Sequence, residues 1–360
     1  MNHLLRRLFP AIAIWLIILP TLSGCWDNKD INHRALPIAM GIAKREGIYV
    51  VILQIPEPGL GATKIRIVQQ TGTTINEIVD RMSKNMESQV DLLHLKVVLF
   101  EASFAEVGVH DIVETFMRAH ALSPNTMAAI CDEPIDTFFH NIEFYNKNNG
   151  TVLINFFEKN AGWNPHIAAD RIWELYRSMR SYTRDTVVPI IRSGKGTVIE
   201  SRGSAVIRNG RFVERLSSDE TLLINVFNGI SARGKIEVMD HATVQIIGTS
   251  IRRRSFIQNG RPILTVSVTL KGSLVETRGQ PTIDQIKKEI DEQLTVRFEG
   301  MLRKLQKENA DILGTGQLFR TKYNRVELSH WRTDYFPQLR IDIKFNSIIQ
   351  NTGNLKAQAQ

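Results

Sequence analysis

Cysteine is scarce in this sequence of 360 residues, in which only Cys25 and Cys131 occur. Two thiols are too few for a framework of several disulfides, and no Cys cluster is present that would hold structural zinc. Folds that depend on disulfides or on a Cys-rich zinc site are therefore excluded. The hydrophobic content of 43% and the charged content of 23% are ordinary for a soluble globular protein.

Recognisable catalytic motifs are also missing. The sequence has neither a Gly-x-Ser-x-Gly elbow nor a His-Glu-x-x-His pair. The segment 193–197 fails as a phosphate loop, because Pro189 stands where a Gly is needed and Gly196 where Ser or Thr should follow the Lys. The histidines are scattered, and those at His94, His110, His120 and His140 do not have the spacing of a metal-binding or catalytic motif. We therefore expect no catalytic residue, no metal site, no cofactor and no enzymatic activity.

Beyond residue 24, no apolar run is long enough to cross a membrane. The apolar run 12–19 is itself too short, since a membrane helix needs about 20 such residues, and it follows the basic pair Arg6 and Arg7. A basic start and a short apolar core are typical of a signal peptide.

A lipid-attachment motif follows this run, with the order Leu22, Ser23, Gly24, Cys25. The two small residues let the backbone enter a narrow peptidase cleft, and the Cys25 thiolate is the nucleophile that accepts diacylglycerol. We expect residues 1–24 to be removed as a lipoprotein signal peptide and Cys25 to carry S-diacylglycerol and an N-acyl group such as palmitate. The alternative is an ordinary signal anchor in which a cysteine happens to follow Gly24.

Two further expectations depend on this assignment. Residues 25–30 form a polar spacer in which Trp26 either rests at the lipid headgroups or packs on the first domain. With Cys25 lipidated, Cys131 has no intramolecular partner, and its apolar neighbours favour a buried residue over a reactive thiol.

The charge balance is positive. Lys and Arg exceed Asp and Glu by 45 to 37, a net charge of +8, and loss of Arg6 and Arg7 leaves +6. Beside an acylated terminus this favours an anionic lipid surface over nucleic acid, for which no binding motif is present. One basic cluster comprises Arg252, Arg253, Arg254 and Arg261. It is a candidate contact for lipid phosphates or for an acidic partner surface. The alternative is a solvated edge strand that its charges keep from aggregating.

Periodicity predicts three consecutive α+β domains, each a mixed sheet with helices. Domain I, residues 31–195, alternates strands and helices, and Asn164-Pro165 is expected to start a helix that runs through Tyr176. Domain II, residues 196–240, contains a hairpin with an Asn209-Gly210 turn and a short helix capped by Ser217.

Domain III, residues 241–360, is expected to pack a long helix on an antiparallel sheet. A second Asn-Gly turn at 259–260 joins two strands, and a third strand closes the sheet over 339–349. The helix, about 283–309, carries one apolar stripe, which is typical of packing against a sheet.

Motifs along the mature chain resemble the GerAC-type, or Ger(x)C, spore germination lipoproteins. At the start these are Cys25-Trp26-Asp27, Asp30-Ile31-Asn32, Ala35 and Gly41-Ile42. Further along they are His94-Leu95-Lys96, Val98-Leu99-Phe100, 104–108 and Arg118, then 203–207 with Leu216 and Glu220, and finally 311–316, Trp331, Phe336 and 339–349. The sequence departs from the family pattern at Asp30, Ala119, Leu313 and Thr315, which bears on local packing.

The resemblance implies a non-enzymatic, lipid-anchored C subunit of a nutrient germinant receptor on the outer face of the spore's inner membrane. It also implies two integral membrane partners, the A- and B-type subunits. Two other functions remain open from the residues alone. A solute-binding lipoprotein would serve a transporter but would have two similar lobes, and a tethered hydrolase would need a nucleophile-base pair.

Overall fold

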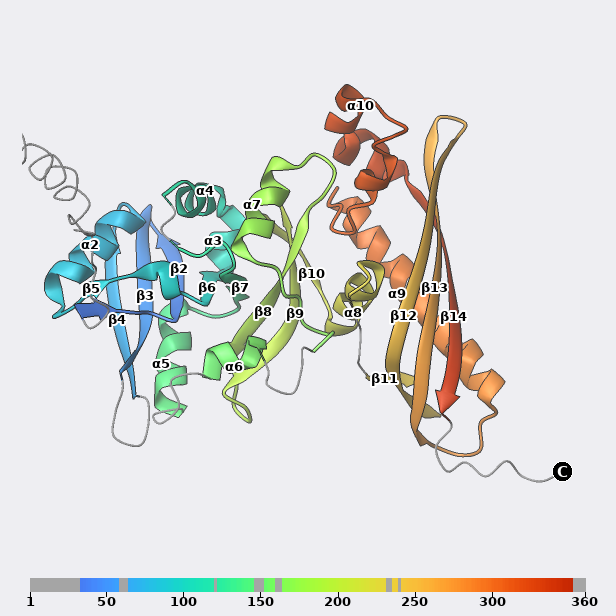
Figure 1. Cartoon of the computed structure of the whole chain (residues 1–360), viewed down its shortest axis with the longest axis horizontal. Helices are drawn as coiled ribbons and strands as arrows, with labels where there is room; N and C mark the ends of the chain where they lie inside the picture. The colour runs from blue at the N-terminus through green and yellow to red at the C-terminus, as the bar shows by residue number, and fades with distance from the viewer. Residues whose placement is uncertain are drawn as a thin grey trace, which may run out of the picture.

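The structure is a computed structural model that describes residues 33–57, 64–119, 122–145, 152–158, 164–230, 235–238 and 241–351. Figure 1 shows an elongated molecule with a large sheet toward the N-terminal end and a smaller sheet toward the C-terminal end. The helix α8 (Ser218–Phe227) lies between the two sheets. The α+β class predicted from the sequence is confirmed.

The large sheet has eight strands in the order β10-β9-β8-β7-β6-β2-β3-β4. Its four central strands, β2, β6, β7 and β8, are parallel, and antiparallel strands flank them on both sides. The strand bounds are β2 Ala39–Arg45, β3 Ile48–Glu57, β4 Lys64–Gly72, β6 Val97–Glu101, β7 Met127–Cys131, β8 Thr186–Ser193, β9 Ile199–Arg208 and β10 Arg211–Leu216. A separate parallel pair joins β1 (Arg34–Ala35) to β5 (Gln89–Val90).

Helices cover both faces of this sheet, because its central strands present apolar side chains on both sides. One face packs against α2 (Ile75–Asn85), α3 (Ala102–Val107), α4 (His110–Ala119) and α7 (Ile172–Arg180). The other packs against α5 (Ile135–Tyr145) and α6 (Val152–Glu158). Thr74 caps the start of α2, since its Oγ1 accepts a hydrogen bond from Glu77 N at 3.2 Å. A 3-10 turn, η2 (Leu92–His94), precedes β6.

The hairpin that the sequence analysis assigned to domain II continues the large sheet. Its turn forms as predicted, with Asn209 at φ 49° and Gly210 at φ 75°. Its first strand, β9, pairs with β8 from Thr186↔Ile207 to Ser193↔Ile199. The predicted boundary at 195–196 therefore falls inside one sheet, because backbone hydrogen bonding carries the sheet past it.

The start of α7 also differs from the prediction. Asn164 forms a local turn, in which its Oδ1 accepts a hydrogen bond from His166 N at 3.1 Å, and the helix begins only at Ile172. The reason lies in the intervening backbone, where Asp170 O accepts from Ala128 N at 3.2 Å and Arg171 bridges Met127. Pairing at the start of β7 holds these residues extended.

The C-terminal sheet has four strands in the order β11-β12-β13-β14. Its strands are β11 Lys235–Val238, β12 Ala242–Gln258, β13 Arg261–Thr277 and β14 Arg340–Asn351. The hairpin β12–β13 turns at Asn259 and Gly260 as predicted. However, β14 runs parallel to β13, so the sheet is mixed and not wholly antiparallel. The helix α9 (Ile283–Lys307) lies between β13 and β14 in the chain. It carries the chain back along the sheet, so β14 can start beside the first residues of β13 and run parallel to it.

The apolar stripe of α9 faces this sheet as predicted. Ile286, Ile290, Leu294, Phe298 and Leu305 are all buried. On β13 the side chains alternate, with Leu264, Val266, Val268 and Leu270 buried toward α9 and Thr265 and Ser267 exposed on the opposite face. After α9 the chain forms η3 (Thr315–Phe319), α10 (Arg325–Ser329), the π-helical turn η4 (Trp331–Tyr335) and η5 (Phe336–Gln338).

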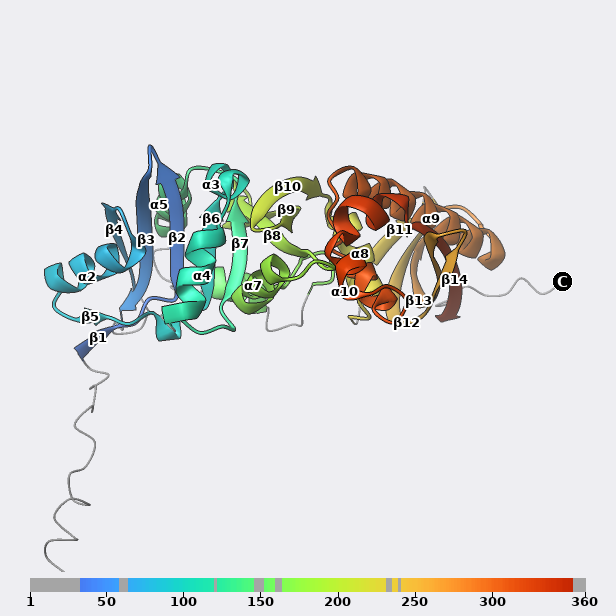
Figure 2. The same ribbon diagram turned by 90° about the horizontal axis from the view of Figure 1, so that it is seen from above.

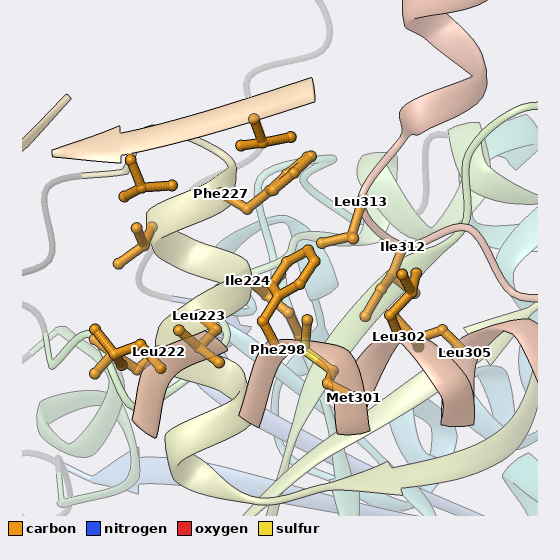
Figure 3. Close-up of a cluster of buried hydrophobic side chains, with 14 of the residues drawn as sticks. Leu222, Leu223, Ile224, Phe227, Phe298, Met301, Leu302, Leu305, Ile312 and Leu313 are labelled. Atoms are coloured by element: carbon orange, nitrogen blue, oxygen red, sulfur yellow. The ribbon is translucent and has the colours of Figure 1, made fainter. Parts of the chain in front are cut away.

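One core joins α8 to both sheets. Figure 3 shows Leu223 and Phe227 of α8 facing Phe298 and Met301 of α9. The rings of Phe227 and Phe298 are stacked, with centroids 6.0 Å apart. The same core includes Val206 of β9, so the large sheet and the C-terminal sheet share one apolar interior through α8.

The cap of α8 gives a first testable prediction. Ser217 Oγ accepts a hydrogen bond from Glu220 N at 3.1 Å, and Glu220 Oε2 accepts from Ser217 N at 2.8 Å. Ser217→Ala removes one half of this box and is expected to lower the free energy of unfolding by about 1 kcal/mol. Urea denaturation measures the change. Ser218→Ala is the matched control, because no hydrogen bond uses its hydroxyl among the described residues, and an equal loss in both variants would contradict the capping role.

Candidate functional site: a buried junction and a basic sheet face

The residues expected to carry the lipid lie outside the described part of the chain. These are the lipobox residues Leu22, Ser23 and Gly24, the lipidated Cys25 and the neighbouring Trp26, together with the rest of 1–30. Among the described residues, no helix is both long enough and apolar enough to span a membrane.

The residues weighed for chemistry stay apart in the fold. Within the described ranges, no three His, Cys, Asp or Glu side chains come close enough to hold a metal ion. His94 lies in η2, His110 starts α4 and His140 lies in α5, whereas His120 is outside the described residues. Cys131 is fully buried in β7, as predicted, and burial raises the pKa of its thiol, so the thiol stays protonated and unreactive.

A polar cluster with a buried centre connects the large sheet to the C-terminal region. We call it the junction, and it consists of Asp185, Asn209, Asp311, Trp331 and Arg332. Asp185 directly precedes β8 and Asn209 is in the β9–β10 turn, whereas Asp311 follows α9 and Trp331 and Arg332 begin η4. Asp185 and Arg332 are 147 positions apart in the chain. The junction therefore joins segments that only the tertiary fold brings together.

Arg332 makes the central contact of the junction. Its Nε donates to Asp185 Oδ2 at 2.9 Å and its Nη2 to Asp185 Oδ1 at 2.7 Å, a bidentate pair. Its Nη1 also donates to Asn209 Oδ1 at 3.1 Å, and its Nη2 to the carbonyl oxygens of Ser178 and Arg184. The Asp185 side chain is 0% exposed and that of Arg332 is 13% exposed, so this ion pair is screened little by solvent.

The second carboxylate, Asp311, is held by four donors. Its oxygens accept from Thr315 N and Thr315 Oγ1, both at 2.9 Å, from Gly316 N at 2.8 Å and from Trp331 Nε1 at 2.9 Å. Asp311 N also donates to Asp185 Oδ2 at 2.9 Å, and Asp185 N donates to Asp311 O at 2.8 Å. These contacts fix the loop after α9 onto the segment before β8.

Glycine is required beside this carboxylate. A Cβ added at Gly316 would lie 2.7 Å from Trp331 Nε1 and 2.7 Å from Thr183 Cβ, closer than packed atoms approach. Trp331 is itself fully buried and packs on Phe319, with ring centroids 5.2 Å apart. The loop sequence is thus dictated by close packing as well as by hydrogen bonding.

Burial shapes the electrostatics of both acids. It raises the pKa of Asp185 to about 6, with the Arg332 guanidinium opposing the rise and the Asp311 carboxylate adding to it. Burial also raises the pKa of Asp311, opposed by the hydrogen bonds from Gly316, Thr315 and Trp331. The carboxylates of Asp185 and Asp311 are buried and their oxygens accept hydrogen bonds from within the cluster, so the cluster is suited to coupling the two regions mechanically.

Sequence reasoning did not identify the junction as a site. The segment 311–316 and Trp331 were noted only as points of resemblance, and nothing near Asp185 or Arg332 in the sequence signalled a partner.

Two more contacts tie the same regions together. Lys304 Nζ of α9 pairs with Glu220 Oε1 of α8 at 2.8 Å, and Arg208 Nη1 of β9 donates to Glu308 O at 2.6 Å.

The structure separates the four arginines of the predicted basic cluster. Arg252 and Arg254 pair across the sheet with Ser267 and Thr265, on the exposed face that points away from α9. Arg261 pairs with Gln258, which is an even number of positions after Arg252 and Arg254 on β12, so Arg261 lies on that face too. Arg253 lies on the other face, where its guanidinium carbon is 4.5 Å from the centroid of the Phe227 ring. Three of the four arginines therefore share one face.

Two open pockets occur in the large-sheet region. One, of about 360 Å³, is bordered by α2 and β5 and includes the ion pair of Arg34 with Asp91. The other, of about 350 Å³, lies beside His94 and Thr126 at the start of β6 and β7. Each pocket is formed within one region, unlike the cleft between two similar lobes that a solute-binding lipoprotein would use.

Comparison with known protein families matches nearly the whole chain in two consecutive parts. Residues 27–193 match the family described as "Spore germination protein N-terminal domain". Residues 202–353 match the family described as "Spore germination B3/ GerAC like, C-terminal". The junction joins these two parts, because Asp185 belongs to the first and Arg332 to the second.

Several curated proteins are similar over most of their length. Spore germination protein KC of Bacillus subtilis (strain 168) is 22% identical over 408 residues, covering 97% of both chains. Spore germination protein GerQC of Bacillus cereus is 20% identical and covers 89% of this chain and 93% of its own. The solved structure titled "Crystal Structure of the GerBC protein" matches with a TM-score of 0.58 at 19% identity, over 86% of this chain and 96% of that one, which supports the same fold.

Proposed function

Because the chain belongs to the GerAC-like family of spore germination proteins, we propose that it acts as the lipid-anchored C subunit of a spore nutrient germinant receptor. In this role it is held by Cys25 at the outer face of the spore's inner membrane and works with two integral membrane subunits of the A and B types. Its contribution is to receptor assembly or signalling.

The observation that carries this proposal is the match of both halves of the chain, 27–193 and 202–353, to germination protein domains. The relatives compared above are named as germination proteins, and each matches this chain over most of its own length. The lipobox supplies the means of attachment.

A binding and coupling role, not catalysis, fits the arrangement of polar residues. The polar side chains of the junction join two regions of the protein. The Asp185 carboxylate is paired with Arg332, and the Asp311 carboxylate accepts hydrogen bonds from backbone and indole donors. Such a rigid connection lets a displacement in one region reach the other. We therefore propose a non-enzymatic subunit whose two regions move as one body.

Co-purification tests the proposed assembly. A chain tagged at its C-terminus is expressed in spores, the membranes are solubilised in mild detergent, and proteins recovered with the tag are identified by mass spectrometry. The expected result is recovery of the A- and B-type subunits in comparable amounts. Recovery of the tagged chain without them, from membranes that contain both, would argue against a receptor subunit.

A further inference from the structure

One face of the C-terminal sheet is basic and uncovered. The strand register places six basic side chains on the outward positions of β12, β13 and β14, against the acidic residues Asp342 and Glu276. The basic residues, which we call the basic face, are Arg252, Arg254, Arg261, Lys271, Arg340 and Lys344. The opposite side of the same strands is covered by α9, so the two faces of this sheet differ in both charge and partner.

Most of this charge is not used within the protein. In the part of the chain that the structure describes, no ion pair or side-chain hydrogen bond involves Arg252, Arg254, Arg261, Lys271 or Lys344. Only Arg340 is paired, through its Nε to Asp342 Oδ1 at 2.7 Å. Exposed hydroxyls separate the basic side chains, with Thr265 beside Arg254 and Ser267 beside Arg252. Cations interspersed with hydroxyl donors suit phosphate oxygens.

The basic face and the beginning of the described chain share one side of the molecule. Figure 1 shows β12, β13 and β14 in front of α9. In the view from above, β1 lies at the lower edge of one end, β12 and β13 lie at the lower edge of the other end, and α9 runs along the upper edge. Arg34 of β1 is nine residues after Cys25, a stretch that spans at most roughly 32 Å when fully extended. A flat surface reached by Cys25 can therefore also meet the basic face.

We propose that the basic face lies against the anionic headgroups of the membrane, as a second contact that orients the protein along the bilayer. The face is an extended sheet surface whose charges are spread over three strands, which matches a planar array of phosphates. An exposed apolar residue, Ile348, 39% exposed, neighbours Lys271 on the same face, and such a residue can enter the headgroup layer. This proposal rests on the proposed lipid anchor, which keeps the face near a bilayer.

Vesicle flotation with the unlipidated chain 25–360 carrying Cys25→Ala tests this contact separately from the anchor. Vesicles of phosphatidylglycerol and phosphatidylcholine are compared with vesicles of phosphatidylcholine alone. The chain is expected to bind the anionic vesicles, and binding should weaken as salt is raised, because salt screens exposed charges. Each basic residue near such a surface contributes about fivefold in partitioning, so Arg252→Gln, Arg254→Gln and Arg261→Gln together should lower binding by about 100-fold.

The matched control removes the same charge from the exposed side of α9, with Lys288→Gln, Arg303→Gln and Lys307→Gln. It should lower binding by less than tenfold, and both triple variants should melt at the temperature of the parent chain. Equal losses in the two variants, or equal binding of the parent to neutral vesicles, would overturn the proposal. A third outcome would also overturn it: the arginine variant binds vesicles as the parent does but recovers less of the integral subunits on co-purification. That result would assign the basic face to an acidic protein surface. None of the vesicle outcomes bears on Cys25, because the chain used with the vesicles carries no lipid.

Discussion

In spores that lack the A- and B-type subunits, Cys25→Ala is expected to move the protein from the membrane fraction to the soluble fraction. Each buried acyl CH₂ contributes about 0.8 kcal/mol to membrane binding. A single myristoyl chain gives only marginal binding, whereas two chains give stable anchoring, so loss of a diacylglycerol removes nearly all of the affinity. Fractionation after a high-salt wash, which screens the basic face, measures the change directly.

The second cysteine provides the control for this experiment. Cys131 is buried in β7, so Cys131→Ala should remain in the membrane fraction. Mass spectrometry of the mature wild-type protein should find the acyl mass on Cys25 and a new N-terminus at that residue. If Cys25→Ala still fractionates with membranes in spores that lack the A- and B-type subunits, the anchor is not at Cys25.

Arg332→Met is expected to have the largest effect on stability among exchanges at the junction. Methionine keeps much of the apolar volume but leaves the buried Asp185 carboxylate without its cation. Removal of one partner of a buried ion pair costs about 3 to 5 kcal/mol, because the remaining charge stays desolvated. Urea denaturation at pH 8 measures the loss. Arg325→Met, at an exposed position of α10, is the control and should change stability by less than about 0.5 kcal/mol.

The cost of Arg332→Met should depend on pH in a defined direction. The pKa of Asp185 is raised to about 6 in the folded protein, so the folded state binds this proton more readily than the unfolded state does between about pH 4 and 6. The stability from that proton is complete below about pH 4 and is lost as the pH rises through 6. Without the guanidinium the pKa rises further, and the carboxyl is neutral at pH 5. The destabilisation should therefore be clearly smaller at pH 5 than at pH 8, and an equal cost at both would contradict the role assigned to Asp185.

Features with local causes could be read from the sequence. The turn at Asn259-Gly260 forms because both residues accept positive φ, and the cap of α8 forms because Ser217 and Glu220 are three positions apart. The buried stripe of α9 follows from the helical period alone. Each of these depends on residues within a few positions of one another, so no knowledge of the fold is needed.

Features that depend on residues far apart in the chain could not be read from the sequence. The hairpin of β9 and β10 joins the large sheet because β9 pairs with β8, and no local pattern distinguishes that arrangement from a separate domain. The direction of β14 depends on how α9 crosses the sheet. Arg332 and Asp185 meet although 147 positions separate them, and neither residue has a neighbour that signals the contact. The junction was thus visible in the sequence only as the motif 311–316 and Trp331, without Asp185, Asn209 and Arg332.

The measurement that tests the central claim most directly is the germination of spores in which this gene is deleted and then restored. Loss of refractility is followed after addition of individual amino acids and sugars. We predict that the deletion slows or abolishes the response to at least one nutrient, that the wild-type gene restores it, and that Cys25→Ala restores it weakly or not at all. Unchanged germination of the deletion spores with every nutrient, in a strain whose other receptors have been removed, would contradict the assignment as a germinant receptor subunit.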